Sequence, residues 1–356
     1  MKISIDCRML GMSGIGNYLK GCLLILINTN NNFVLIGDEK KIIPIVKEYS
    51  NYNIINYKVK PFSIIDTFLI NKEILKSINN CDIYYSPFFN IPCGIKIPVF
   101  LTIHDILFMD MPNIVSFFGL HIRIYFYKRA IIKANLIFTV SEFSKSRIIH
   151  HLGNNKCIIN ASNAIIHDNY SITKNKKKYI LFIGNIKEHK GLKILMEAYC
   201  NAILEDLEYK LIIMGEKNNF RSFDKNTAKF LNKLNSNDII FTGNINDSEK
   251  LNYLSEASLL VQPSLYEGFG YPPLEAMYCG TNVLISDIPV FKEIYKDYPV
   301  TYFKSGDSYD LKNKLFNLLH NKKSTVLNLS KNLKEKYNFN KTVSIILNEM
   351  ENLNIK

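Results

Sequence analysis

The sequence predicts an α/β protein of two domains, each built on its own parallel sheet. The chain has 356 residues, too many for one ordinary domain, and two domains of roughly 150 to 190 residues are the natural division. Short apolar runs with strand character alternate with helical stretches in both halves, as in βαβ units. The polar, basic stretch 167–178 separates the two series. We therefore expect an N-terminal domain at 1–166, a linker at 167–178 and a C-terminal domain at 179–338.

In the first half, the runs that read as strands are Lys2–Cys7, Phe33–Ile36, Asp82–Tyr85, Val99–Ile103 and Ile137–Val140. The first run leads into a loop that contains Gly11, Gly14 and Gly16, and an apolar helix is expected from Tyr18 to Ile27. Loops at this place approach the ligand in doubly wound folds. The glycines are not spaced as Gly-x-Gly-x-x-Gly, so a dinucleotide site is not predicted.

The second half begins with a buried strand at Tyr179–Gly184, followed by a loop to Gly191 and a helix from Leu192. Two more strands are expected at Lys210–Met214 and Ile239–Thr242. The closing helix is expected at Val343–Ile355, within the C-terminal segment 339–356. The second domain therefore repeats the strand and helix alternation of the first.

The stretch Leu259–Ala276 carries the strongest local signal and reads as strand, loop and helix. The Pro272-Pro273 pair marks the helix start, because proline fits the first turn, where its missing N–H would have had no partner. Gly268 and Gly270 let a ligand approach the backbone. The free N–H groups at the start of the helix would suit a phosphate.

Two glutamates flank this loop, Glu267 at the strand end and Glu275 in the first helical turn. Carboxylates accept hydrogen bonds from hydroxyls, so the site would take hydroxyls next to phosphates, which is the chemistry of a sugar nucleotide. Each feature alone also has an ordinary structural explanation. Glutamate is common in first helical turns, and two close glycines can form a tight turn.

The string from Glu267 to Glu275, Glu-Gly-Phe-Gly-Tyr-Pro-Pro-Leu-Glu, resembles the signature of the retaining glycosyltransferases of family 4. That family has the GT-B fold, in which two Rossmann-like domains face each other across a cleft and the C-terminal helix tends to cross back to the first domain. The resemblance covers most of the chain and is densest from residue 179 to 294. It implies transfer of a hexose-type sugar from a nucleoside-diphosphate sugar to a glycan or lipid-linked glycan, with retention of configuration.

The resemblance implies catalytic roles for three residues. Glu267 would hold hydroxyls of the donor sugar, and His104, at the carboxyl end of a strand, would face that sugar from the first domain. Lys190 would grip the diphosphate as a point charge. The residues implied in donor binding are Gly14, Gly16, Asn185, Lys187, Gly268, Phe269, Gly270, Tyr271 and Glu275.

One position departs from the family's pattern. Asn185 stands where relatives often carry an arginine, so Lys187 or His189 would have to replace its charge. This departure keeps a second reading open, that of a catalytically inactive or regulatory partner with the same fold. A sugar-nucleotide epimerase or a glycan phosphorylase would use this fold too, although phosphorylases are usually much longer.

No metal cofactor is expected, because the sequence contains no Asp-x-Asp, the usual metal clamp of sugar-nucleotide enzymes of the other major fold. The charge of the leaving diphosphate would instead be met by Lys190, by the amides of residues 268–271 and by the helix dipole.

The net charge of +12 is spread over the chain, with an excess of +7 in residues 1–170 and +5 in residues 171–356. Such spread favours a general attraction to anionic surfaces, although a biased base composition would also enrich lysine. The segment Ile114–Lys133, in which Arg123, Lys128, Arg129 and Lys133 are interleaved with apolar residues, can form an amphipathic basic helix that lies against a membrane. A core helix with a cationic outer face would explain the same pattern. We expect contact with an anionic membrane and a polyprenyl-linked glycan as acceptor. No nucleic acid is expected, since no recognition module is present.

Seven cysteines are scattered without a Cys-x-x-Cys pair, which indicates a reducing compartment and no structural zinc. Asp6 stands where a signal peptide needs its apolar centre, and the run Cys22–Ile27 is too short to cross a bilayer. We therefore expect a cytoplasmic protein that is peripheral on the inner face of the cell membrane.

Overall fold

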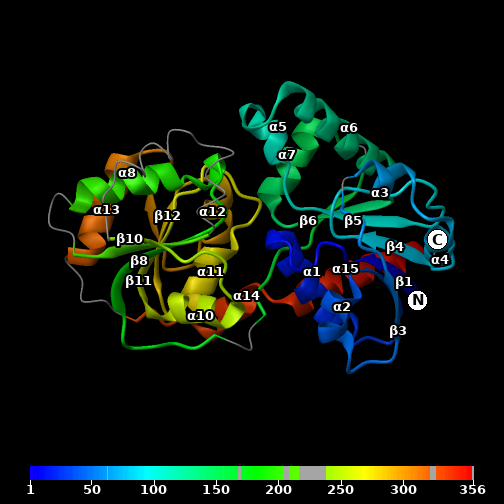
Figure 1. Ribbon diagram of the computed structural model, residues 1–356, viewed down its shortest axis with the longest axis horizontal. Helices are drawn as coiled ribbons and strands as arrows, with labels where there is room; N and C mark the ends of the chain where they lie inside the picture. The colour runs from blue at the N-terminus through cyan, green and yellow to red at the C-terminus, as the bar shows by residue number, and fades with distance from the viewer. Residues whose placement is uncertain are drawn as a thin grey trace. The chain divides into compact units, whose positions relative to one another are not determined.

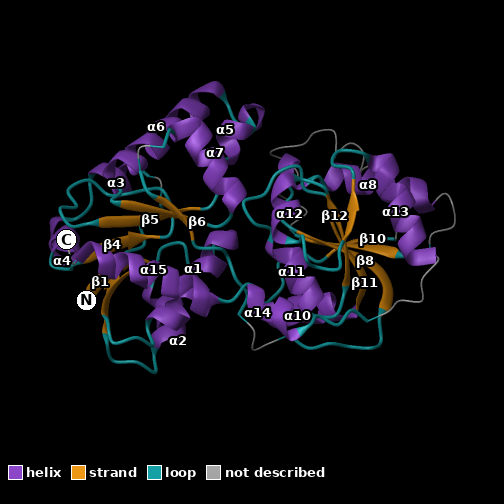
Figure 2. Cartoon of the chain, turned by 180° about the vertical axis from the view of Figure 1, so that it is seen from behind, coloured by secondary structure: helices purple, strands orange, loops and turns teal. Residues whose placement is uncertain are grey.

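The computed structural model describes residues 1–61, 63–154, 156–166, 170–203, 208–215, 238–320 and 326–354. The chain forms two compact units, one of Met1–Ile166 with Tyr337–Lys356 and the other of His167–Lys336 (Figure 1). Each unit holds one parallel sheet covered by helices (Figure 2), which confirms the predicted α/β class. Residues 167–169 of the predicted linker lie outside the described residues.

The sheet of the first unit has seven strands in the order β3-β2-β1-β4-β5-β6-β7. They are β1 (Lys2–Asp6), β2 (Asn32–Gly37), β3 (Tyr52–Asn56), β4 (Ile83–Ser86), β5 (Val99–Ile103), β6 (Leu136–Thr139) and β7 (Ile158–Asn160). β1 pairs with β2 on one side and with β4 on the other. The strand order therefore changes direction beside β1, and the loops after β1 and β4 open at this switch point, where doubly wound sheets bind ligands.

Helices cover both faces of this sheet. They are α1 (Ser13–Leu26), α2 (Glu39–Val46), α3 (Ile64–Phe68), α4 (Lys72–Asn79), α5 (Leu107–Asp110), η1 (Pro112–Ile114), α6 (Phe117–Lys133), α7 (Glu142–Leu152) and α15 (Phe339–Asn354). α15 lies beside α1 although the two come from opposite ends of the chain (Figure 1). A Cβ on Gly21 would lie 2.1 Å from the ring of Phe339, so the glycine makes room for this close packing.

The first helix starts earlier than predicted. α1 begins at Ser13, so Gly14 and Gly16 lie in its first turn and not in the loop before it. The predicted start at Tyr18 was therefore five residues too late. A Cβ on Gly16 would lie 2.6 Å from the carbonyl oxygen of Met9, so the glycine lets the preceding turn pack against the helix. Gly14 is exposed.

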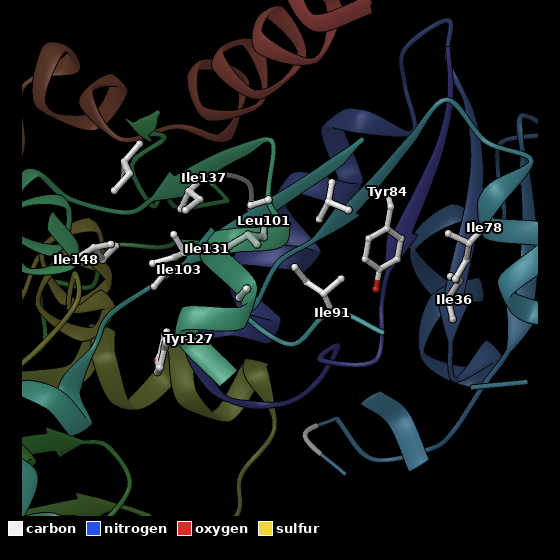
Figure 3. Close-up of a cluster of buried hydrophobic side chains, with 14 of the residues drawn as sticks. Ile36, Ile78, Tyr84, Ile91, Leu101, Ile103, Tyr127, Ile131, Ile137 and Ile148 are labelled. Atoms are coloured by element: carbon white, nitrogen blue, oxygen red, sulfur yellow. The ribbon is translucent and has the colours of Figure 1, made fainter. Parts of the chain in front are cut away.

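A buried apolar cluster holds α6 and α7 on one face of the sheet (Figure 3). Leu101 and Ile103 of β5 and Ile137 of β6 belong to this cluster, together with Tyr127 and Ile131 of α6. All five are buried. The inner side of α6 is thereby fixed to the core.

The sheet of the second unit has six strands in the order β10-β9-β8-β11-β12-β13. They are β8 (Lys177–Ile183), β9 (Lys210–Met214), β10 (Ile239–Phe241), β11 (Ala257–Gln262), β12 (Asn282–Ser286) and β13 (Thr301–Phe303). β8 pairs with both β9 and β11. The switch point of this sheet therefore lies between β8 and β11, whose exit loops contain the candidate site residues.

The helices of the second unit are η3 (Glu188–Lys190), α8 (Leu192–Ile203), α10 (Asp247–Glu256), α11 (Tyr271–Tyr278), α12 (Pro289–Ile294), α13 (Ser308–His320) and α14 (Lys331–Lys336). β8 begins two residues before the predicted strand. The Nζ of Lys176 explains the early start, because it donates to the Ser255 carbonyl oxygen at 2.6 Å and to Thr281 Oγ1 at 2.7 Å. Among the described helices, none is long and apolar enough to cross a bilayer.

Candidate functional site

The exit loops of β8 and β11 lie side by side, because the two strands are neighbours. The backbone N–H of Leu265 donates to the carbonyl oxygen of His189 at 2.8 Å. Gly191 has a φ of +67°, and a Cβ there would lie 1.9 Å from the carbonyl oxygen of Pro263. The loops therefore touch through their backbones, and only glycine fits at this contact.

Lys190 and Glu267 form an ion pair where the two loops meet. The Nζ lies 2.7 Å from one carboxylate oxygen and 2.8 Å from the other. The Glu267 side chain is 9% exposed and that of Lys190 22%, so water screens the pair only in part. Two of the three predicted catalytic residues are thus in contact. Glu267 lies five residues beyond the end of β11, and its predicted place at the strand end was wrong.

A chain of side-chain hydrogen bonds holds Glu267 from behind. Ser264 Oγ donates to Glu267 Oε1 at 2.8 Å, and Gln262 Nε2 donates to Ser264 Oγ at 2.9 Å. Ser286 Oγ, at the end of β12, donates to the Ser264 carbonyl oxygen at 2.5 Å. The carboxylate is therefore oriented by the ends of two strands and not by its own loop alone.

Glu275 lies in the second turn of α11, because the helix begins at Tyr271; the predicted place in the first turn was wrong. Its Oε1 accepts a hydrogen bond from Lys250 Nζ of α10 at 2.6 Å. Its Oε2 is buried and has no hydrogen-bond partner in the described part of the chain. A buried carboxylate oxygen left in this state is an acceptor that a ligand hydroxyl can satisfy.

The start of α11 is shaped by Gly270, whose φ is +88°. A Cβ there would lie 2.5 Å from the ring of Phe291, and the Tyr295 hydroxyl donates to the Gly270 carbonyl oxygen. The predicted donor-binding residues of this loop differ in their exposure to solvent. Gly268 and Phe269 are buried within the loop, whereas Tyr271 is partly exposed at the helix start.

The loop after β8 contains both residues that could replace the charge of the family's arginine, Lys187 and His189. Asn185 and Lys187 are exposed, whereas His189 is buried. Burial, and after it the positive charge of the neighbouring Lys190, lower the pKa of His189 to about 4. His189 is therefore neutral near pH 7, and Lys187 is the residue of the two that can supply positive charge.

His104 follows β5 in the first unit. Its Nε2 lies 2.9 Å from the Pro87 carbonyl oxygen, and its ring meets that of Tyr18 edge to face, 4.9 Å between centroids. Burial lowers the pKa of His104 to about 4, so the ring is neutral near pH 7. A neutral ring that donates from Nε2 keeps a lone pair on Nδ1, which can accept a hydrogen bond from a hydroxyl.

Sequence reasoning missed a buried charged cluster at the carboxyl end of β1. The guanidinium of Arg8 donates to Asp6 Oδ1 at 2.9 Å and to Oδ2 at 2.5 Å, and it also binds Asp66 of α3. Asn90 donates to the other oxygen of Asp66. The cluster ties α3 to the switch point of the first sheet. The only feature of the sequence that pointed to this cluster is the pair of charged residues, Asp6 and Arg8, at the end of the first apolar run.

Lys250 was missed too, because nothing in the sequence relates it to Glu275, 25 residues away on another helix. The seven cysteines are free. In the described ranges, no three His, Cys, Asp or Glu side chains lie together as metal ligands do.

The predicted basic face of α6 is wrong in part. Arg123 NH1 donates to the Gly119 carbonyl oxygen at 2.9 Å, and its guanidinium lies over the ring of Phe108. Arg129 NH2 donates to Cys93 Sγ at 3.0 Å. Both arginines are partly buried against the protein, and the lysines, Lys128 and Lys133, are exposed. The helical pattern was right, but arginine stems found partners inside the unit.

Residues 166–337 match the family described as Glycosyl transferases group 1. An uncharacterised glycosyltransferase of Methanocaldococcus jannaschii is 26% identical over a match that spans 79% of this chain and 78% of that protein. The O-antigen chain mannosyltransferase B of Escherichia coli is 29% identical, and the match spans 60% of this chain and only 59% of that protein.

A crystal structure of HepE from Anabaena in complex with UDP and glucose covers 99% of this chain and 100% of its own, with a TM-score of 0.75 and 16% identity. This likeness concerns the fold of the whole chain. The string from Glu267 to Glu275 lies inside the matched residues and brackets a loop at the carboxyl edge of the second sheet. Residues 166–337 are therefore a group 1 glycosyltransferase domain, and the chain as a whole has the GT-B fold.

Proposed function

We propose that the protein transfers a hexose from a nucleoside-diphosphate sugar to a glycan acceptor, with retention of configuration and without a metal ion. The observation that carries the proposal is the arrangement of two lysine and glutamate pairs, Lys190 with Glu267 and Lys250 with Glu275, around the start of α11. Such a surface offers positive charge for phosphates beside carboxylate oxygens for sugar hydroxyls.

The donor would use both pairs. Glu275 Oε2, which has no hydrogen-bond partner in the described residues, would accept hydrogen bonds from the ribose hydroxyls. The N–H groups at the start of α11 and Lys190 would bind the diphosphate. Glu267, held by Ser264, would hold hydroxyls of the sugar. Lys190 would then be shared between Glu267 and phosphate oxygens.

The proposed reaction needs no protein nucleophile. The acceptor hydroxyl attacks the anomeric carbon on the face that the diphosphate leaves. The bond from that carbon to the phosphate oxygen breaks as the bond to the acceptor oxygen forms, and the leaving phosphate oxygen takes the hydroxyl proton. Lys190 and the dipole of α11 stabilise the charge that grows on the diphosphate. His104, whose ring is neutral near pH 7, offers a hydrogen-bond acceptor at the carboxyl end of the first sheet.

The relatives suggest which sugar to test first. The Escherichia coli relative is named a mannosyltransferase that acts on O-antigen chains, so mannose and a growing surface glycan come first. Glucose comes second, because the HepE structure holds UDP and glucose. We propose that this acceptor is carried on polyprenyl diphosphate, which would place the enzyme on the cytoplasmic face of the membrane as a peripheral protein.

The test is the release of free nucleoside diphosphate from GDP-mannose, UDP-glucose and dTDP-glucose, each with and without lipid-linked glycan. We expect release that requires the acceptor and that continues in EDTA. Release without acceptor would indicate hydrolysis. Donor binding without turnover on any acceptor would support the inactive partner instead, and loss of transfer in EDTA with recovery in Mg²⁺ would overturn the metal-independent mechanism.

A further inference from the structure

We propose that the outer face of α6 inserts its apolar side chains into the interfacial layer of an anionic membrane. The outer face consists of Phe117, Phe118, Ile122, Tyr125 and Ile132, with Lys128 and Lys133 among them. The inference rests on the proposed function, because an acceptor on polyprenyl diphosphate lies in a membrane. It replaces the predicted basic contact by an apolar one.

The exposure of this face is high for such side chains. Phe117 is 71% exposed, Phe118 80% and Ile132 72%. Of the twelve large hydrophobic side chains that are exposed in the described residues, five lie on α6. Steps of three or four residues lead from Phe118 to Ile122 and Tyr125, so these side chains share one side of the helix. Single exposed apolar residues are ordinary, but a group on one helix indicates an interaction surface.

The helix cannot turn this face inward. Tyr127, Ala130 and Ile131 on its other side are buried in the core (Figure 3). The guanidinium of Arg123 lies over the ring of Phe108 of α5, and Arg129 donates to the Ile91 carbonyl oxygen. α3 runs near α6 (Figures 1 and 2), and the guanidinium of Arg129 lies over the ring of Phe68 at its end. Phe68 and Leu69 are exposed as well and extend the apolar surface.

Charge decides between a lipid surface and a second copy of the chain. α6 contains four Lys and Arg side chains and no Asp or Glu over its 17 residues. A two-fold dimer through this face would bring the same cationic surfaces together, at a cost in like-charge repulsion. Anionic headgroups attract the same lysines, whose stems can lie along the apolar surface while the ammonium groups stay in water.

Aromatic and aliphatic side chains beside lysines are typical of a helix that lies in the plane of the interface. At 1.5 Å per residue, α6 would lie there over about 25 Å. Its inner side contacts the loop that carries His104, because the Tyr127 hydroxyl donates to the carbonyl oxygen of Asp105 at 3.0 Å, next to His104. The helix would thus hold the His104 loop close to the lipid that carries the acceptor.

The chain contains no tryptophan, so a single introduced indole reports on one place. We would measure the emission of Phe118→Trp with vesicles of equal parts phosphatidylglycerol and phosphatidylcholine, and with brominated phosphatidylcholine as quencher. The matched control is Tyr309→Trp, since Tyr309 is 69% exposed on α13 in the other unit. We expect a blue shift and quenching for Phe118→Trp and neither for Tyr309→Trp.

Sedimentation with the same vesicles separates apolar insertion from attraction of charge. Phe118→Gln with Ile122→Gln should weaken binding by about tenfold for each side chain removed from the lipid. Lys128→Gln with Lys133→Gln should weaken it by about fivefold for each lysine at low salt. Part of the wild-type binding should persist at about 1 M salt, where charges are screened within about 3 Å.

Three results would overturn the inference: no change of emission with vesicles, binding that only the lysine variant weakens, and a blue shift that rises with protein concentration and ignores vesicles. The last would indicate a second copy as the partner. Nucleotide-sugar binding should be the same in wild type and in Phe118→Gln with Ile122→Gln. If neither wild type nor this variant bound any nucleotide sugar while wild type still bound vesicles, the proposed function would be refuted and the membrane-binding role of the outer face would be supported.

Discussion

At the scale of single residues, Glu267 and Glu275 differ in how many of their carboxylate oxygens already have hydrogen-bond partners. Glu267 has both oxygens engaged by Lys190 and is oriented by Ser264, whereas Glu275 keeps Oε2 open in the described part of the chain. An engaged, oriented carboxylate suits the reacting sugar, where position matters. An open buried oxygen suits recognition of a fixed part of the donor such as the ribose.

We therefore predict different defects for the two glutamine variants. Glu275→Gln should raise the KM for the donor with little change in kcat, and Glu267→Gln should lower kcat. Each change should be about ten- to a hundredfold, because each loses charge-assisted hydrogen bonds of about 1.5 to 3 kcal/mol. Asp297→Asn, in an exposed ion pair with Lys336, is the control. Wild-type kinetics in both glutamine variants would refute the assignment of the site.

Two histidines with lowered pKa values predict how stability depends on pH. Burial lowers the pKa of His104 and of His189 from 6.5 to about 4. Below pH 6.5 the unfolded chain takes up these protons while the folded protein does not, so the free energy of unfolding should fall between pH 6.5 and about 4. Above pH 7 the two side chains should contribute no slope.

Urea unfolding between about pH 4 and pH 8 measures this loss, with wild type compared to His104→Asn combined with His189→Asn. Carboxylates also titrate at the acid end, but their contribution to the free energy of unfolding is the same in both proteins and cancels in the difference between the two profiles. We expect a difference on the order of 2 kcal/mol per histidine. His121→Asn, at an exposed position of α6, should follow the wild type. Parallel profiles for wild type and the double variant would contradict the burial argument.

At the scale of elements, the site depends on the backbone contact between the loops after β8 and β11. Gly191 combines a left-handed φ of +67° with an approach that leaves no room for a Cβ. Gly243 has nearly the same φ, +68°, but nothing lies within 4 Å of where its Cβ would be. Alanine variants of Gly191 and Gly243 therefore separate the free-energy cost of a left-handed backbone from the cost of a steric clash.

Gly243→Ala should lower the free energy of unfolding by about 1 kcal/mol, the cost of a left-handed alanine. Gly191→Ala should lower it by about 2 kcal/mol more, because the Pro263 carbonyl must move, and should also displace Lys190. Thermal unfolding and donor KM check both effects. Equal losses in the two variants would show that the loops do not rely on this contact.

Local patterns also explain which elements were predictable. Strands that are mostly apolar and fully buried, such as Val99–Ile103, were predicted to the residue. β3, β7 and β13 were not, because they are short or half polar and owe their pairing to the neighbouring strand. The helices α1 and α11 began away from their predicted starts, since tertiary contacts of Gly16 and Gly270 outweighed the local glycine and proline signals.

At the scale of the whole molecule, the sequence was sufficient for the α/β class and for the two loops of the second unit. The string from Glu267 to Glu275 is contiguous, so its residues could be assigned together. Lys250, Ser264 and the Arg8 cluster could not, because their roles arise from partners that the sheet order brings near. The direction of Arg123 and Arg129 was equally out of reach, since it depends on the Phe108 ring of α5 and on the Ile91 carbonyl oxygen.

The central claim is that the second unit binds a nucleoside-diphosphate sugar through Glu275 and the Lys190 loop. Thermal unfolding with increasing GDP-mannose, UDP-glucose and dTDP-glucose tests it most directly, because a ligand of the native state adds stability of about 2.7 kcal/mol at a hundred times its Kd. We predict that at least one of these donors raises the Tm of wild type and of Asp297→Asn. Glu275→Gln should need a donor concentration at least about ten times higher for the same rise in Tm. No rise with any donor, or an equal rise in Glu275→Gln, would contradict the account.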